Sequence, residues 1–138
     1  MKIEIIGLGF VGLSLTSVLA SKGFNVVGID VDEKKCKKIS EGISPFFEPD
    51  LEKILKNALK KKLQIKSDIA IVQDCDLIFV TVGTPQNRTG AIDLSVIKKA
   101  MSSLGKSIRK SKKQHTILIK STVVPGTCLL YTSPSPRD

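Results

Sequence analysis

The chain has 138 residues, of which 41% are hydrophobic and 25% are charged, a balance typical of one globular domain with a buried core. No apolar run approaches the roughly 20 residues that span a bilayer, and Glu4 and a glycine turn interrupt the apolar start. These features argue against a membrane protein and against a secretory leader, so we expect a cytoplasmic protein with no membrane partner.

The net charge is +9 and comes nearly all from lysine, which raises the question of nucleic-acid binding. The lysines are spread over several expected helices, and no aromatic residues alternate with them. We therefore interpret them as solvated helix faces and expect no nucleic-acid partner. Their positive field would still attract an anionic cofactor and substrate.

The three cysteines, Cys36, Cys75 and Cys128, are scattered, without a CxxC pair or a nearby set of histidines. This pattern supports neither a metal site nor a disulfide. Cys36 falls in an expected lysine-rich surface helix, and Cys75 comes just before an expected buried strand. His115, the single histidine, opens an apolar segment, and we interpret it as structural.

The first expected elements form a strand–helix–strand unit. A short β-branched strand at 2–6 runs into the turn Gly7-Leu8-Gly9-Phe10-Val11-Gly12, and a segment with helical spacing follows up to Lys22-Gly23. A second strand at 24–29 ends at Asp30. This GxGxxG pattern, with an acid after the second strand, predicts a dinucleotide site.

Each part of that pattern has a physical role. Gly7 permits a sharp turn, Gly9 lets a pyrophosphate approach the backbone, and Gly12 lets the helix pack on the sheet. The helix N-terminus supplies free N–H groups and a positive dipole end for the phosphates. Asp30 would accept both adenosine ribose hydroxyls and repel a 2′-phosphate, which favours NAD over NADP.

The rest of the chain alternates helices and strands. We expect helices at 34–40, 51–61 (capped by Asp50) and 94–110 (capped by Asp93), and a brief helical piece at 67–72. Strands are expected at 63–65, 76–82 and 116–120, and loops at 44–49 and 87–92. The expected core face of the long helix comprises Val96, Ile97, Ala100, Met101, Leu104 and Ile108. The alternation predicts an α/β fold, a Rossmann-type doubly wound parallel sheet that is incomplete at its C-terminal end.

Ligands bind at the carboxyl ends of the strands in such sheets, so three loops should share one rim, at 7–12, 83–85 and 121–127. Thr84 and Thr122 would present hydroxyls there. Either threonine could contact a ligand or serve only in a turn or helix cap, as Ser and Thr often do, and both interpretations stay open.

Several motifs together resemble the UDP-glucose/GDP-mannose dehydrogenase family, in its amino-terminal NAD-binding domain. They are IGLGFVGL, GIDVDEKK, PFFEPDL, VTVGTP, DLS and STVVPGT, and they occur in the family's order over residues 1–127. The resemblance is closest to the UDP-glucose 6-dehydrogenase branch. It implies an NAD-dependent four-electron oxidation of a nucleotide sugar's C6 alcohol to a carboxylate, through a thiohemiacetal and a thioester.

The resemblance also implies roles for particular residues. The pyrophosphate would lie on the glycine turn, the adenosine ribose on Asp30, and the adenosine near Lys35. Thr122 would act as an auxiliary catalytic residue that helps to position a water or the sugar's oxygen. The implied cofactor-binding residues are Gly7, Leu8, Gly9, Phe10, Val11, Gly12, Asp30, Lys35, Val82, Gly83, Thr84, Pro85, Ser121, Thr122 and Val123.

Parts of the family pattern are absent from these 138 residues: the nucleophilic cysteine in its GxCxPKD-type motif, and the glutamate downstream of STVVPGT. Asp50 also stands where the family usually has glycine. We expect residues 1–127 to be a truncated NAD-binding domain, inactive alone, of a homo-oligomeric parent that makes a polysaccharide precursor. UDP-glucose is the expected substrate; UDP-N-acetylhexosamines and GDP-mannose remain open. The alternative is a stand-alone NAD-binding module without catalysis.

Residues 128–138 break the pattern, because they contain two prolines and no helical apolar period. Back-translated, they are similar to a sequencing-library adapter read in frame. We interpret them as a non-native segment, and the alternative is a genuine disordered tail.

Overall fold

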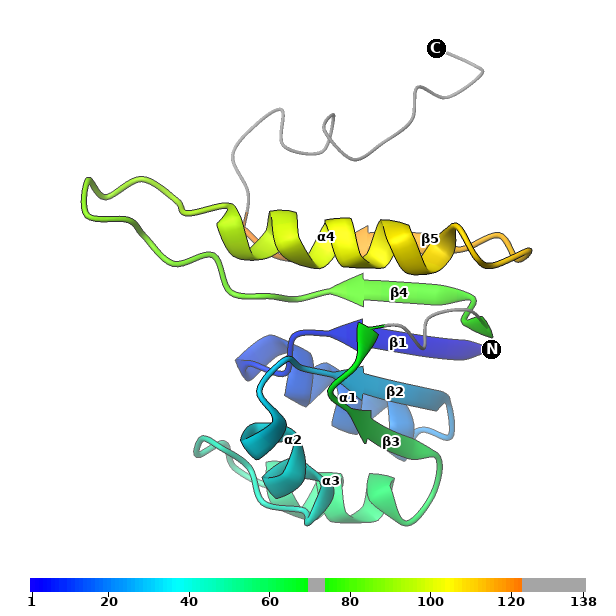
Figure 1. The fold of residues 1–138 in the computed structure, drawn as a ribbon. Helices are drawn as coiled ribbons and strands as arrows, with labels where there is room; N and C mark the ends of the chain where they lie inside the picture. Colours follow the sequence, from blue (N-terminus) through cyan, green and yellow to red (C-terminus); the bar gives the residue numbers. More distant parts are fainter. Residues whose placement is uncertain (70–73, 123–138) are drawn as a thin grey trace.

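Five parallel strands form the single sheet of a computed structural model that describes residues 1–69 and 74–122 (Figure 1). The strands are β1 (Lys2–Ile6), β2 (Asn25–Ile29), β3 (Leu63–Lys66), β4 (Leu77–Val80) and β5 (Thr116–Ile119). Their spatial order is β3-β2-β1-β4-β5, so the winding reverses between β1 and β4. The predicted doubly wound α/β fold is confirmed.

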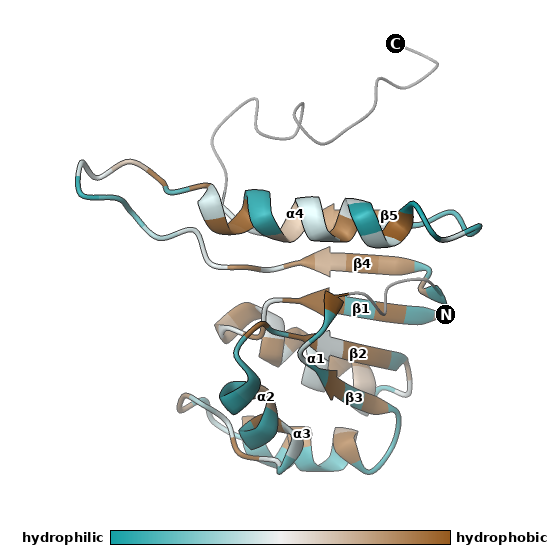
Figure 2. Cartoon of the chain, in the orientation of Figure 1, coloured by the Kyte–Doolittle hydropathy of each residue, from teal (hydrophilic) through white to brown (hydrophobic). Residues whose placement is uncertain are grey.

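Helices cover both faces of the sheet and create two cores. Along β1, alternate side chains point to opposite faces, so Ile3 and Ile5 join one core and Ile6 joins the other. The first core holds residues of α1 (Phe10–Ser21), α2 (Glu33–Ser40) and α3 (Leu51–Leu59), and the second holds those of α4 (Ser95–Ile108). Figure 2 shows the strands as mostly hydrophobic, whereas α2 is mostly hydrophilic.

Local sequence signals explain several helix ends. Asp32 caps α2, because its Oδ1 accepts a hydrogen bond of 3.0 Å from the N–H of Lys35. Gly23 follows α1 with φ +97°, a left-handed conformation that suits a residue without Cβ. Asp93 Oδ1 accepts a hydrogen bond of 2.8 Å from the N–H of Ser95, the first residue of α4.

Two local predictions are wrong, those for Asp50 and Val96. Asp50 does not cap α3 with its side chain; it adopts φ +61°, and no side-chain oxygen bonds the helix. Cys36 lies in the expected lysine-rich helix, α2, but on its buried side, where its thiol donates to the carbonyl oxygens of Asp30 and Lys66. Val96 is exposed rather than in the core, since its side chain lines a cavity while its neighbour Ile97 is fully buried.

Other predictions fall partly outside the described residues. The helical piece expected at 67–72 overlaps residues 70–73, and the expected turn at 121–127 is described only at Ser121 and Thr122. Val123 and the segment 128–138 also lie outside the described residues.

Candidate cofactor-binding site

The turn between β1 and α1 is so tight that two of its positions accept only glycine. Gly7 has φ +98°, and a Cβ there would lie 2.8 Å from the backbone nitrogen of Val82. A Cβ on Gly12 would lie only 1.8 Å from the carbonyl oxygen of Gly7. The turn is therefore pressed between α1 and the end of β4, at the point where the winding of the sheet reverses.

The N-terminus of α1 opens beside this turn. Gly9 is the residue before the helix, so it has no side chain to cap the first turn, and a Cβ at Gly9 would meet no atom of residues 1–69 and 74–122 within 4 Å. The first N–H to bond within the helix belongs to Leu13, which donates to the carbonyl of Gly9 over 2.9 Å. The N–H groups of Phe10, Val11 and Gly12 therefore lack intrahelical partners, as expected for an anion site.

Asp30 lies at the carboxyl end of β2 and is buried, with 8% of its surface exposed. Its Oδ2 accepts hydrogen bonds from the N–H of Leu8 over 2.8 Å and from Nζ of Lys35 over 2.7 Å. Its Oδ1 accepts one from the N–H of Asp32 over 3.0 Å. Burial acts to raise the pKa of Asp30, but these hydrogen bonds outweigh burial and hold that pKa below its usual value. The carboxylate is ionised at neutral pH.

A cavity of about 560 Å³ joins these features along the carboxyl ends of β1, β2 and β4. Predicted residues that line it are Gly7, Gly9, Asp30, Lys35, Val82 and Gly83. Lining residues that the sequence analysis missed include Ile69, Thr81, Val96, Lys99, Ala100 and Ser103. The helical spacing of Val96 and Ala100 indicated core packing rather than the wall of a cavity, and the sequence analysis gave no signal for Lys99 and Ser103.

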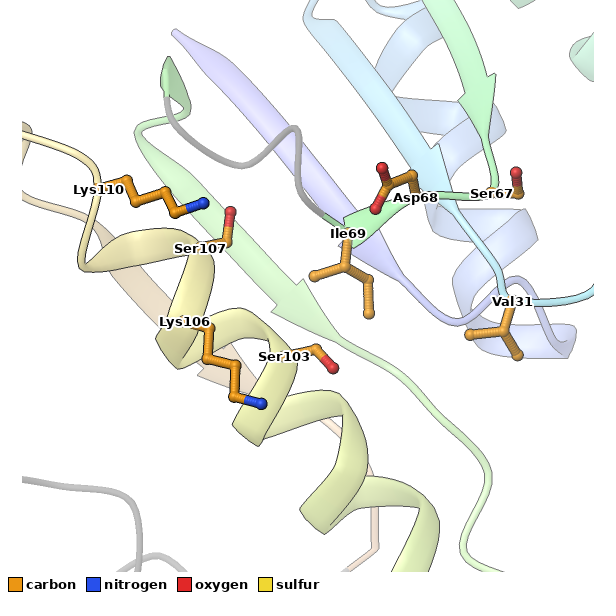
Figure 3. Close-up of a pocket in the computed structure, with 8 residues that line it drawn as sticks. All are labelled: Val31, Ser67, Asp68, Ile69, Ser103, Lys106, Ser107 and Lys110. Carbon is orange, nitrogen blue, oxygen red and sulfur yellow. The ribbon is translucent and has the colours of Figure 1, made fainter.

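A second cavity of about 390 Å³ adjoins the first and shares Val31, Ile69 and Ser103 with it (Figure 3). Lys106 of α4 and Lys110, just after that helix, lie on one side of it, and Ser67 and Asp68 lie on the other. The first cavity is the stronger candidate site, because it holds the ionised Asp30 and the open end of α1.

The other predicted residues within the described part of the chain are not among those that line the first cavity. Leu8 is buried, and Phe10 is exposed and stacks on Phe46 with ring centroids 4.1 Å apart. Ser121 donates from Oγ to the carbonyl oxygen of Val82 over 2.6 Å. Val11, Gly12, Thr84, Pro85 and Thr122 are also absent from the cavity lining.

The other candidate reactive groups lie outside this cavity. Burial raises the pKa of both the Cys36 and the Cys75 thiols, which opposes a role as nucleophile. His115 donates from Nδ1 to the carbonyl oxygen of Cys75 over 2.8 Å, at the amino ends of β4 and β5, which is the opposite end of the strands from the cavity.

Within residues 1–69 and 74–122 we find no group of three His, Cys, Asp or Glu arranged to hold a metal ion. The helices of this same part of the chain include none long and apolar enough to cross a membrane.

Comparison with known proteins identifies the relatives of this fold. The profile of the UDP-glucose/GDP-mannose dehydrogenase family, NAD-binding domain, matches residues 1–134. The chain belongs to this family. The domain is accordingly one that binds NAD, and the glycine turn, the open end of α1 and the ionised Asp30 fit that cofactor.

Individual relatives share this domain. A GDP-mannose 6-dehydrogenase of Pseudomonas aeruginosa is 38% identical over 92% of the chain, and a UDP-glucose 6-dehydrogenase of Haloferax volcanii is 33% identical over 97%. These matches cover 30% and 31% of the two relatives, so the chain spans about a third of their length.

Solved structures give the same result. A ternary complex of GDP-mannose dehydrogenase from Pseudomonas aeruginosa superposes with a TM-score of 0.92 and 37% identity, over 95% of this chain and 30% of that one. A UDP-glucose dehydrogenase from Pyrobaculum islandicum superposes with a TM-score of 0.87 and 34% identity, over 91% of this chain and 30% of that one.

Proposed function

We propose that the glycine turn and Asp30 hold NAD, with the pyrophosphate at the N-terminus of α1 and the adenosine ribose at the carboxylate. One observation carries this assignment: Asp30 is ionised, lines the cavity and bonds directly to the glycine turn. Lys35 pairs with the same carboxylate and lines the same cavity, which supports a place beside the adenosine. Rim residues Thr84, Pro85, Ser121, Thr122 and Val123 would approach the nicotinamide end, with Thr122 as an auxiliary catalytic residue.

The wider proposal is that this domain serves a nucleotide-sugar dehydrogenase that oxidises a C6 alcohol to a carboxylate. NAD supplies a hydride acceptor, and the four-electron reaction consumes two molecules of it for each sugar. The domain's own residues bind and orient the cofactor. The nucleophilic cysteine and the sugar site would come from the part of the relatives that this chain does not span, so the 138 residues alone should not oxidise a nucleotide sugar.

Two substrates are candidates for the whole protein. UDP-glucose is favoured by the form of the VGTP and FEP loops, and a 33% identical relative carries that activity in its name. GDP-mannose is favoured by the 38% identical relative and by the TM-score of 0.92. The stand-alone NAD-binding module remains the alternative of a different class.

The experiment has two parts. Calorimetric titration of the 138-residue chain should show binding of NAD, with NADP binding more weakly. The gene should then be resequenced beyond the codon of Thr127, and the complete product should be assayed for NADH formation with UDP-glucose and GDP-mannose in parallel. A complete reading frame that lacks a downstream cysteine motif, or a product inactive on nucleotide sugars, would instead support the stand-alone module.

A further inference from the structure

Thr81 follows β4 and is buried, with 9% of its surface exposed. Its hydroxyl lies 2.7 Å from the carbonyl oxygen of Gly7 and 3.1 Å from that of Ile6. A hydroxyl has a single hydrogen to donate, so the two carbonyls share it. The side chain of Thr81 therefore fastens the end of β4 to the first residue of the glycine turn, 74 positions earlier in the chain.

Gly7 and its carbonyl oxygen make contacts with three parts of the fold: β2, the end of β4 and the first turn of α1. The N–H of Gly7 donates to the carbonyl of Ile29 over 2.7 Å, so Gly7 is held from the β2 side as well. A Cβ on Gly12 would lie 1.8 Å from the Gly7 carbonyl oxygen and 2.6 Å from Oγ1 of Thr81. The hydroxyl, the carbonyl and the first turn of α1 thus meet in one contact.

We propose that Thr81 is a positioning residue for the pyrophosphate-binding turn, acting through Gly7 rather than on the cofactor itself. Without the hydroxyl, the partly buried carbonyl of Gly7 would lose this partner and the turn would shift to find another. The N–H groups at the start of α1 would then no longer converge on the pyrophosphate. This inference rests on the proposed binding of the pyrophosphate at α1.

The test uses two ligands that share adenosine and differ in the pyrophosphate. Thr81→Val removes the hydroxyl and nearly preserves the shape, whereas Thr81→Ser keeps the hydroxyl. For Thr81→Val we expect the affinity for ADP-ribose to fall on the order of tenfold, which corresponds to one lost hydrogen bond. Adenosine affinity should change less than about twofold, and Thr81→Ser should restore ADP-ribose binding to within about threefold.

Thr16 offers a matched control. It is a fully buried threonine of α1 whose hydroxyl has no hydrogen-bond partner among the residues that the structure describes. Thr16→Val should therefore leave ADP-ribose binding unchanged. If Thr81→Val does not fold, Thr81→Ala replaces it. As an independent measurement, the NMR chemical shifts of the Phe10, Val11 and Gly12 amides in Thr81→Ser report the position of the turn.

The outcomes separate the two proposals. Failure of the unaltered chain to bind ADP-ribose would overturn the proposed cofactor site, and the inference would fall with it. If the unaltered chain binds, equal losses for adenosine and ADP-ribose, or no loss in Thr81→Val, would overturn the positioning role alone. A serine variant as weak as the valine variant would also overturn it.

Discussion

The N–H of Leu8 donates a hydrogen bond of 2.8 Å to Oδ2 of Asp30, so the acid after β2 also holds the glycine turn after β1. The two elements that we propose to contact the ribose and the pyrophosphate are therefore linked before any ligand arrives. In the proposed site, one carboxylate would both select the ribose and, through this hydrogen bond, hold the loop that would receive the phosphates, so the site would be preorganised.

The dual role of Asp30 leads to a prediction for Asp30→Ser. The shorter serine cannot reach Leu8 and carries no charge, so the preference for NAD over NADP should approach parity. NAD affinity should fall by about tenfold as well, because the brace on the turn is lost. Asp30→Asn is the matched control, because it keeps an acceptor oxygen near Leu8 and should lose preference more than affinity. Calorimetry with both cofactors measures the effects, and unchanged preference in Asp30→Ser would contradict the assignment.

Lys35 should stabilise the domain through Asp30, in a way that depends on pH. Lys35→Met removes the ion pair, and because Lys35 is 28% exposed we expect a loss of only about 0.5–1 kcal/mol at pH 7. The folded-state pKa of Asp30 is lowered, so its contribution is present above the unfolded pKa of about 4 and disappears as the pH falls through the folded value.

Denaturant titrations of Lys35→Met and the unaltered chain should therefore converge below pH 4. The exposed neighbour Lys34 provides the control. The difference in stability between Lys34→Met and the unaltered chain should not shrink as the pH falls below 4. A difference in stability that stays constant between pH 7 and pH 3 would disprove the link to Asp30.

The surroundings of the Glu4 side chain disfavour its charged form. Glu4 lies fully buried in β1. Burial raises its pKa, against the weaker opposing effects of Lys2, the Cys75 thiol and Lys66. A raised folded pKa means that stability is greatest below the unfolded pKa and is lost as the pH rises through the folded one. Glu4→Gln should therefore stabilise the domain by about 1 kcal/mol at pH 8 and by nothing near pH 4.

Thermal unfolding across this pH range measures the effect of Glu4. Glu41→Gln changes an exposed glutamate and should leave the pH profile unaltered. The prediction is wrong if Glu4→Gln is less stable than the unaltered chain at pH 8.

The sequence predicted the strand–helix–strand unit and Asp30 because that information is local. Glycines at a strand end and an acid at the end of the next strand determine where the turn and the carboxylate lie once the strands pair in parallel. Thr81 could not be found in this way, because its importance lies in a contact with Gly7, 74 residues away.

Helix periodicity had a related limit. It placed Val96 and Ala100 on one face of α4, but it cannot tell where that face passes the edge of the sheet and becomes the wall of a cavity. Asp50 shows a third limit: its residue type suits a helix cap, but its left-handed backbone prevents that role.

Cys75 should be unreactive in the folded protein. Burial, together with the Glu4 carboxylate, raises the pKa of its thiol to about 12, so very little thiolate exists at pH 8. Iodoacetamide treatment followed by peptide mapping should show alkylation of Cys75 only after denaturation. Cys36, which is also buried, serves as an internal comparison. Rapid native labelling of Cys75 would reopen the question of a nucleophilic role.

Asp50 marks a strained position that glycine should relieve. Its φ of +61° lies in the left-handed region, where a side chain is disfavoured and glycine is not, although aspartate is tolerated there better than most residues. Asp50→Gly should be at least as stable as the unaltered chain, and Asp50→Ala should be less stable by about 1 kcal/mol. Denaturant unfolding of the three proteins would measure the expected order of stability, in which the glycine variant is at least as stable as the unaltered chain and the alanine variant is the least stable.

Since the side chain of Asp50 makes no cap bond to α3, Asp50→Asn should match the unaltered chain within about 0.5 kcal/mol. An alanine variant as stable as the glycine variant would mean that the backbone at this position is not left-handed.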